Sequence, residues 1–290
     1  MPLSTPQIWL TEEISRYIPL DKSWEIRRIV LGVVNRTLDW DELKRLNQQP
    51  KISNDLMALY RCAASLILGE SDLHVGESGT LYRILRYLTW KGGMEVQFIK
   101  EWSLAWRNIC TDPNIVNWTQ SQLLTLDNGT SQWATAAALS GDTERLEHPP
   151  YKLQVTYDAI REASLWNITQ KRDITIAQQV RAFLEWKRTS EIIFSGEQAE
   201  DYCFMRAFEI MGKEDGWKKW PALATHESNR LDWFEEQIRL AETWQQITVN
   251  DHRPVAALAM RYNLWRERFL HPDAVNKSWP QFWDFIHHIN

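Results

Sequence analysis

The feature that most constrains the fold is a repeated pattern, in which a short polar turn precedes an apolar helical stretch. Five stretches follow it: PLDKSWEIRRIVLGVVN, GESGTLYRILRYL, DNGTSQWATAAAL, SGEQAEDYCFMRAFEIMG and DHRPVAALAM. Apolar residues three and four positions apart lie on one face of a helix, so each stretch predicts an amphipathic helix behind a turn. The stretch RLDWFEEQIRLAETW predicts a further amphipathic helix, with an apolar face made by Leu231, Phe234, Ile238 and Ala241.

Polar residues at the starts of these stretches predict where the helices begin. Ser23, Thr80 and either Thr130 or Ser131 carry hydroxyls that accept hydrogen bonds from the free N–H groups of a first turn. Pro254 suits the first turn of the helix in DHRPVAALAM, because its missing N–H is not needed there.

Short stretches between the helices are rich in β-branched residues and leucine, and they predict strands. They are SDLHV, LLTL, YKLQV, DITIA and EIIF. Helices that recur with short strands between them predict a mixed α/β fold. The chain of 290 residues has room for one large domain or two medium ones, and no repeat, low-complexity tract or Pro/Gly linker marks a boundary.

Composition excludes several classes of protein. Hydrophobic residues make up 44% and charged residues 24%, which is ordinary for a folded protein. The net charge of -5 argues against a nucleic-acid-binding protein, and no stretch has the ~18 apolar residues of a membrane span. Three widely spaced cysteines and the absence of a signal-peptide pattern predict a cytoplasmic protein. The 17 tryptophans occur mostly singly in amphipathic stretches, which favours core and interface packing over stacking platforms.

Cations and hydroxyls at the helix starts are the candidate functional residues. Helix N-termini favour anions, so a convergence of these starts would form a pocket for a small phosphorylated or carboxylated molecule. The alternative is that each residue only caps its helix. Nucleotide-binding glycine loops and a GxSxG elbow are absent, and His287 and His288 lack a third ligand at metal spacing. We therefore expect no metal and no cofactor.

Seven stretches resemble motifs of a known family when they are taken in order. They are PLDKSWEIRR, ESGTLYRIL, GTSQWATAAAL, HPPYKLQVTYDAI, THESNRL, DHRPVAALAM and NKSWPQFW, which span residues 19 to 286. Their counterparts are the Lys-Ser-x-x-x-Arg, Asn-Ala-Gly-Thr, Ser-Ser-Gln, Pro-Tyr, Lys-Glu-Ser/Thr-Asp-Arg, Asp-His-Arg-Met-Ala and Lys-Thr/Ser-Phe-Pro motifs. The chain thus resembles a shortened and divergent member of the 3-phosphoshikimate 1-carboxyvinyltransferase (EPSP synthase) family.

The resemblance implies a fold and an activity. The fold would be a two-domain inside-out α/β barrel, with a shikimate-phosphate-binding-like domain at 19–195 and a shortened discontinuous domain at 1–18 plus 196–290. The activity would be transfer of the enolpyruvyl group of phosphoenolpyruvate to the 5-hydroxyl of shikimate 3-phosphate, with release of phosphate. This reaction belongs to the shikimate pathway of aromatic amino acid biosynthesis. The family also implies a monomer with small-molecule anions as its partners, without nucleic acid or membrane.

The same resemblance assigns roles to residues of this chain. Catalysis would use Lys22 and Glu227 to move protons. Shikimate 3-phosphate would be held by Lys22, Ser23, Arg27, Thr130, Ser131, Gln132, Tyr151 and His226. Phosphoenolpyruvate would be held by Lys22, Gly79, Gln132, Arg230, Arg253 and Lys277.

The chain departs from the family pattern at several positions. Trp102 stands where the family has an arginine, His226 where it has a lysine and Glu77 where it has an asparagine. Only fourteen residues separate Gly212 from Glu227, so the segment that bears the family's catalytic aspartate is missing. A rival alignment makes Asp201 that base. The alternative function is therefore a catalytically degenerate homologue that keeps an anion-binding cleft or acts as an interaction module.

Overall fold

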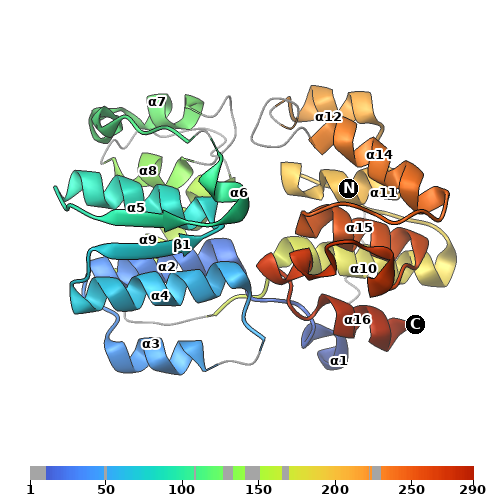
Figure 1. Cartoon of the computed structure of the whole chain (residues 1–290), viewed down its shortest axis with the longest axis horizontal. Helices are drawn as coiled ribbons and strands as arrows, with labels where there is room; N and C mark the ends of the chain where they lie inside the picture. The colour runs from blue at the N-terminus through green and yellow to red at the C-terminus, as the bar shows by residue number, and fades with distance from the viewer. Residues whose placement is uncertain are drawn as a thin grey trace, which may run out of the picture. The chain divides into compact units, whose positions relative to one another are not determined.

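A computed structural model of the chain describes residues 11–48, 51–107, 109–126, 133–140, 151–164, 170–221, 223 and 230–290. Within these ranges the protein is mixed α and β and mainly helical, with one two-stranded sheet that forms no closed barrel. The chain divides into two compact units (Figure 1). Unit 1 combines Met1–Pro19 with Arg172–Asn290, and unit 2 is Leu20–Lys171.

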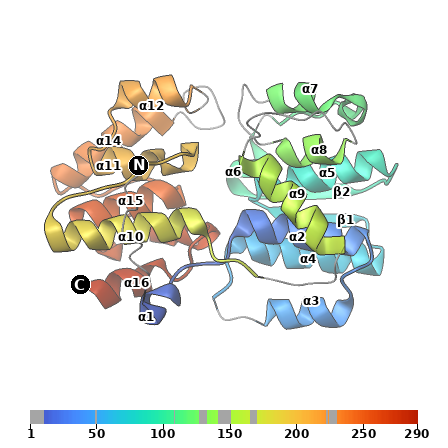
Figure 2. The same ribbon diagram turned by 180° about the vertical axis from the view of Figure 1, so that it is seen from behind.

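Unit 2 places its helices around a pair of parallel strands. Its strands are β1 (Asp72–Gly76) and β2 (Gln97–Lys100), and Leu73 pairs with Phe98 between them. The strand pair lies between α4 and α5, and α9 crosses α2 and α8 (Figures 1 and 2). The helices of the unit are α2 (Lys22–Val34), α3 (Trp40–Asn47), α4 (Asn54–Leu68), α5 (Gly79–Lys91), α6 (Trp102–Ala105), η1 (Pro113–Asn117), α7 (Gln120–Thr125), α8 (Ala134–Leu139) and α9 (Tyr151–Ser164).

The core of unit 2 is filled from α2, α4 and α5. Ile26 and Ile29 of α2 are fully buried, as are Leu59 of α4 and Leu81 of α5. Burial of each large aliphatic side chain stabilises the fold by about 1.5–3 kcal/mol. The apolar spacing in the sequence therefore identifies the buried faces of α2 and α5 correctly.

Unit 1 packs its helices around α15. Eight of the eleven residues of α15 are buried, and it packs against α11, α14, η4 and α16. The elements of the unit are α1 (Glu12–Ser15), α10 (Ile174–Thr189), η2 (Ala199–Asp201), α11 (Tyr202–Ala207), α12 (Lys213–Lys219), α14 (Arg230–Glu242), α15 (His252–Tyr262), η3 (Arg266–Arg268), η4 (Pro272–Lys277) and α16 (Phe282–Ile289). The helix predicted from Leu231, Phe234, Ile238 and Ala241 is confirmed as α14, with all four side chains buried.

Two of the predicted caps are wrong by two positions. Asp21 caps α2, accepting a hydrogen bond from the Trp24 N–H, and Ser23 lies inside the helix. Ser78 caps α5, so Thr80 also lies inside its helix. An earlier side chain reaches the free N–H groups in both cases. Pro254 lies in the first turn of α15, as predicted.

Most of the predicted strands are wrong. SDLHV is confirmed as β1, whereas LLTL lies in α7, YKLQV in α9 and DITIA at the start of α10. Thr119 and Gln122 form a capping box that starts α7, and Asp173 caps α10. These caps and the helical packing outweigh the local β propensity. EIIF is neither helix nor paired strand.

The chain passes from one unit to the other at two positions, and one of them differs clearly from the expected boundary. The first crossing follows Pro19, one residue from the expected boundary after residue 18. The second follows Lys171 and not residue 195, because α10 packs Val180 and Phe183 into the core of unit 1.

Candidate functional site

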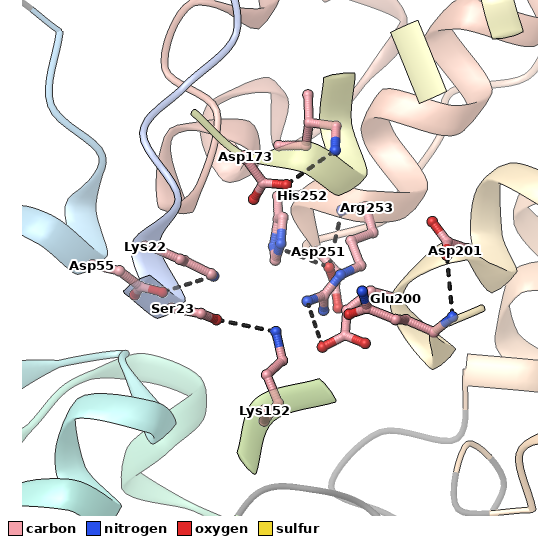
Figure 3. A network of polar contacts seen from close by, with 12 residues as sticks. Lys22, Ser23, Asp55, Lys152, Asp173, Glu200, Asp201, Asp251, His252 and Arg253 are labelled. Atoms are coloured by element: carbon pink, nitrogen blue, oxygen red, sulfur yellow. Dashed lines mark hydrogen bonds and ion pairs between the residues drawn. The ribbon is translucent and has the colours of Figure 1, made fainter. Parts of the chain in front are cut away.

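The start of α2 in unit 2 gathers several of the residues that the sequence singles out. Lys22 Nζ lies 2.8 Å from Asp55 Oδ2 of α4. Ser23 Oγ accepts a hydrogen bond of 3.1 Å from Lys152 Nζ of α9 (Figure 3). Two lysines thus lie beside the first turn of α2, where the helix dipole already favours negative charge.

Arg27 lies one turn further along α2 and is almost wholly buried, with 2% of its surface exposed. Its Nη1 donates to the Ser23 carbonyl oxygen at 2.9 Å, and its Nε donates to Thr156 Oγ1 at 2.7 Å. Thr156 Oγ1 in turn donates to the Lys152 carbonyl oxygen at 2.8 Å. Arg27 therefore holds the start of α2 in place through the Ser23 carbonyl oxygen and links it to α9 through Thr156.

Lys152 is a site residue that sequence reasoning missed. It adjoins Tyr151, which the resemblance singles out, but it lies 129 positions from the serine that it contacts. We call Lys22, Ser23, Arg27 and Lys152 the α2-start cluster. The cluster carries three cations and a hydroxyl, drawn from the first two turns of α2 and from the start of α9.

The start of α5 brings together a second group of cations in unit 2. A Cβ atom placed on Gly79 would lie 3.0 Å from Arg83 Nη1 and 3.3 Å from Arg107 Nη1. Glycine therefore leaves room for two guanidinium groups beside the helix start. Arg107 is a second residue that the sequence reasoning missed, five positions after Trp102, where the family has an arginine.

The start of α15 in unit 1 holds its charges in a different way. The Asp251 carboxylate accepts from the Arg253 N–H at 3.1 Å and lies 3.2 Å from His252 Nδ1. Arg253 Nη2 lies 3.8 Å from Glu200 Oε1 (Figure 3). A carboxylate therefore already faces the cation that the resemblance assigns to phosphoenolpyruvate.

Asp201, the catalytic base of the rival alignment, is buried in unit 1 with 3% of its surface exposed. Its Oδ1 accepts from Gln179 Nε2 at 2.9 Å, and its Oδ2 accepts from the Gln198 N–H at 3.2 Å. Burial raises the pKa of the Asp201 carboxyl, while these two hydrogen bonds lower it. The carboxylate closes a turn around η2, which is a structural use.

The other predicted site residues are described only in part. Tyr151 begins α9 and Arg230 begins α14, and Lys277 ends η4 in unit 1. The remaining ones lie outside the described residues: Thr130, Ser131, Gln132, His226 and Glu227.

Two findings bear on other kinds of site. In the described ranges, no three His, Cys, Asp or Glu side chains gather as they would around a metal ion. Among the same residues, no helix combines the length and apolar character needed to cross a membrane.

His288 faces Glu13 at 3.2 Å and contacts the ring of Tyr17, so it joins α16 to the N-terminal part of unit 1.

Comparison of the chain with protein-family models, with curated proteins and with solved structures found no match.

Proposed function

We propose that unit 2 binds a small phosphorylated hydroxy acid at the start of α2, and that shikimate 3-phosphate is the first ligand to test. The observation that carries this proposal is that Lys152 donates to the Ser23 hydroxyl and Arg27 donates to the Ser23 carbonyl oxygen, next to Lys22 in the first turn of α2. Figure 3 shows Lys22, Ser23 and Lys152. Phosphate groups favour such places, because cations and helix N–H groups act on the same oxygens.

The hydroxyl of Ser23 adds a directional group to this charge. It accepts a hydrogen bond from Lys152, so its own proton is available for a ligand oxygen. Arg27 is held by two hydrogen bonds to neutral oxygens, which keeps the first turn of α2 in place before a ligand arrives. Preorganisation of this kind lowers the entropic cost of binding.

The resemblance extends the proposal to enolpyruvyl transfer. The 5-hydroxyl of shikimate 3-phosphate would give up its proton as its oxygen bonds to C2 of phosphoenolpyruvate, while C3 takes up a proton. Phosphate would then leave as C3 gives up a proton, which restores the C2–C3 double bond and yields the enol ether. Lys22 and Glu227 would move these protons, and Arg253 and Lys277 would hold phosphoenolpyruvate. The fold would be a reduced form of the family's two-domain inside-out α/β barrel.

A second candidate is a catalytically degenerate homologue that binds the anion but does not transfer the enolpyruvyl group. The separation of 3.8 Å between Arg253 and Glu200 favours it, because a carboxylate beside that arginine competes with phosphoenolpyruvate. The placement of Asp201 also favours it, since that carboxylate is used to close a buried turn.

The experiment is a phosphorus NMR time course of the protein with shikimate 3-phosphate and phosphoenolpyruvate. Growth of inorganic phosphate that Lys152→Met abolishes would support the transferase. Unchanged substrates with a broadened shikimate 3-phosphate line would support the binding protein, provided that Lys152→Met sharpens the line. Lys44→Met on α3 is the matched control, because it removes the same charge from unit 2 and should change nothing. Sharp and unshifted lines for the unaltered protein would overturn both candidates.

A further inference from the structure

The segment Glu191–Glu197 joins α10 to η2 in unit 1 and follows an open path between them (Figure 2). Its exposure alternates from residue to residue. Ile192 and Phe194 are half-buried and Gly196 is buried, whereas Glu191, Ile193, Ser195 and Glu197 are exposed. A period of two is that of a β-strand, and isoleucine and phenylalanine favour strands. The segment therefore has the side-chain pattern of a strand without a neighbouring strand.

The main chain of this segment is anchored only at its two ends. At one end, the Glu191 N–H and carbonyl oxygen both contact the Thr189 hydroxyl. At the other, Lys219 Nζ donates to the Gly196 carbonyl oxygen at 2.7 Å. Between them, the N–H and C=O groups of residues 192–195 have no hydrogen-bond partner in the described part of the chain.

Core contacts hold the segment in place from its inner face. Phe194 packs on Phe204 with ring centroids 5.1 Å apart, and Ile192 packs against the same core cluster of unit 1. Ile193 points the other way and is 76% exposed. Because these contacts hold the segment in place before a partner arrives, pairing with a partner costs the segment little conformational entropy.

We propose that residues 191–197 form a docking edge for β-strand addition, in which an extended segment of a partner protein pairs with this main chain. Unpaired N–H and C=O groups in a row are the template that added strands use. This surface belongs to unit 1 and the proposed anion site belongs to unit 2, and the present proposal does not depend on that site.

The outward side chains define the chemistry of the partner. Glu191 and Glu197 stand at the two ends of the outward face, and Ile193 stands between them. The partner segment therefore carries Lys or Arg near each end and an apolar residue between. A second copy of this chain fits poorly, because the antiparallel pairing that uses the whole segment sets Glu191 opposite Glu197. Like charges directly opposite one another destabilise a strand pair.

The test uses the full chain and a labelled peptide, acetyl-Lys-Thr-Val-Thr-Val-Thr-Lys-amide, with binding followed by fluorescence anisotropy. The control peptide has the same sequence and charge, but its central residues are N-methylated and cannot donate. We expect the control to bind at least about tenfold more weakly, as the loss of main-chain hydrogen bonds requires. Equal binding of the two peptides would overturn the proposal, because charge alone would then explain it.

Protein variants locate the edge. Ile193→Pro removes one main-chain donor from an exposed position and should weaken peptide binding about tenfold without changing the melting temperature. Ile193→Thr keeps the donor and the β propensity and should bind nearly as the unaltered protein does. The double variant Glu191→Lys and Glu197→Lys should prefer a peptide with glutamate ends. Unaltered binding by Ile193→Pro would contradict the proposal, as would a dimer in sedimentation equilibrium that Ile193→Pro breaks.

Discussion

The starts of α2 and α15 look alike in sequence and differ in structure. Each first turn follows an aspartate cap and carries basic side chains. At α2, Lys22 is paired with the carboxylate of Asp55, but Arg27 donates to the neutral oxygens of Ser23 and Thr156, and Lys152 donates to the Ser23 hydroxyl. At α15, Arg253 faces the carboxylate of Glu200.

This difference shows that a cation at a helix start is not by itself an anion site. What matters is the group that the cation contacts before a ligand arrives. A carboxylate weakens the field that would attract an anion, whereas a hydroxyl or carbonyl oxygen does not. The start of α2 is the stronger candidate of the two, because the contacts of Arg27 and Lys152 described above are made to neutral oxygens.

The largest expected effect is on stability, at Arg27. Arg27→Met removes one buried and one part-buried charge-assisted hydrogen bond and should lower the free energy of unfolding by about 3 kcal/mol. Arg253→Met breaks only a looser ion pair and should cost less than about 1 kcal/mol. Urea unfolding of the two variants measures the contrast. Equal losses of unfolding free energy in the two variants would mean that the two arginines contribute equally to stability.

Phosphate affinity should depend on the start of α2 but not on the start of α15. Lys152→Met should weaken binding of inorganic phosphate about tenfold, because it removes one charge next to the Ser23 hydroxyl. Arg253→Met should leave phosphate binding unchanged within about twofold, since Glu200 already faces that arginine. Phosphate titration by calorimetry at low and high salt gives both affinities. A larger loss in Arg253→Met would reverse the assignment.

The two aspartate caps should contribute equally to stability. This expectation tests whether the starts of α2 and α15 differ only in the contacts of their cations. Asp21→Ala and Asp251→Ala each remove a side-chain acceptor from a first-turn N–H and should each lower stability by about 1 kcal/mol. Chemical denaturation provides the values. A much larger loss of stability in Asp251→Ala than in Asp21→Ala would contradict this expectation. The contact of Asp251 with His252 would then also stabilise the fold.

The smallest effect is a pH dependence of stability that arises at Glu25 on α2. Burial raises the pKa of this carboxyl, although its ion pair with Arg28 lowers it. A carboxyl whose pKa is raised on folding stabilises the folded state at pH values below its unfolded pKa. That contribution is lost as the pH rises through the folded pKa. Glu25→Gln should flatten this fall, seen as unfolding free energy measured across mildly acidic to neutral pH. An unchanged slope would assign the pH dependence to other groups.

The helices of this protein could be predicted from the sequence more readily than its strands. The spacing of Leu231, Phe234, Ile238 and Ala241 identifies α14, because burial of one helix face requires it. Short stretches such as YKLQV contain too few residues to separate strand from helix. Leu153 and Val155 are buried within α9, so the packing of that helix decides the outcome.

The candidate site could be predicted only where its residues are close in sequence. Lys22, Ser23 and Arg27 share one helix, so their proximity follows from helical geometry. Lys152 and Asp55 reach them from α9 and α4, and no local spacing encodes those contacts. Arg107 likewise reaches Gly79 from beyond β2 and α6. Such contacts are properties of the packed fold.

The ends of unit 2 adjoin one another, since the Asp21 N–H donates to the Lys171 carbonyl oxygen at 2.8 Å. Unit 1 closes in the same way, because the Asp173 N–H donates to the Pro19 carbonyl oxygen at 2.9 Å. A segment whose two ends meet can be spliced into a host, or cut out of it, without pulling the host apart. Unit 2 therefore has the form of an inserted domain. Such a domain can be exchanged in evolution, and it can be expressed alone or have its ends joined to make a circular permutant.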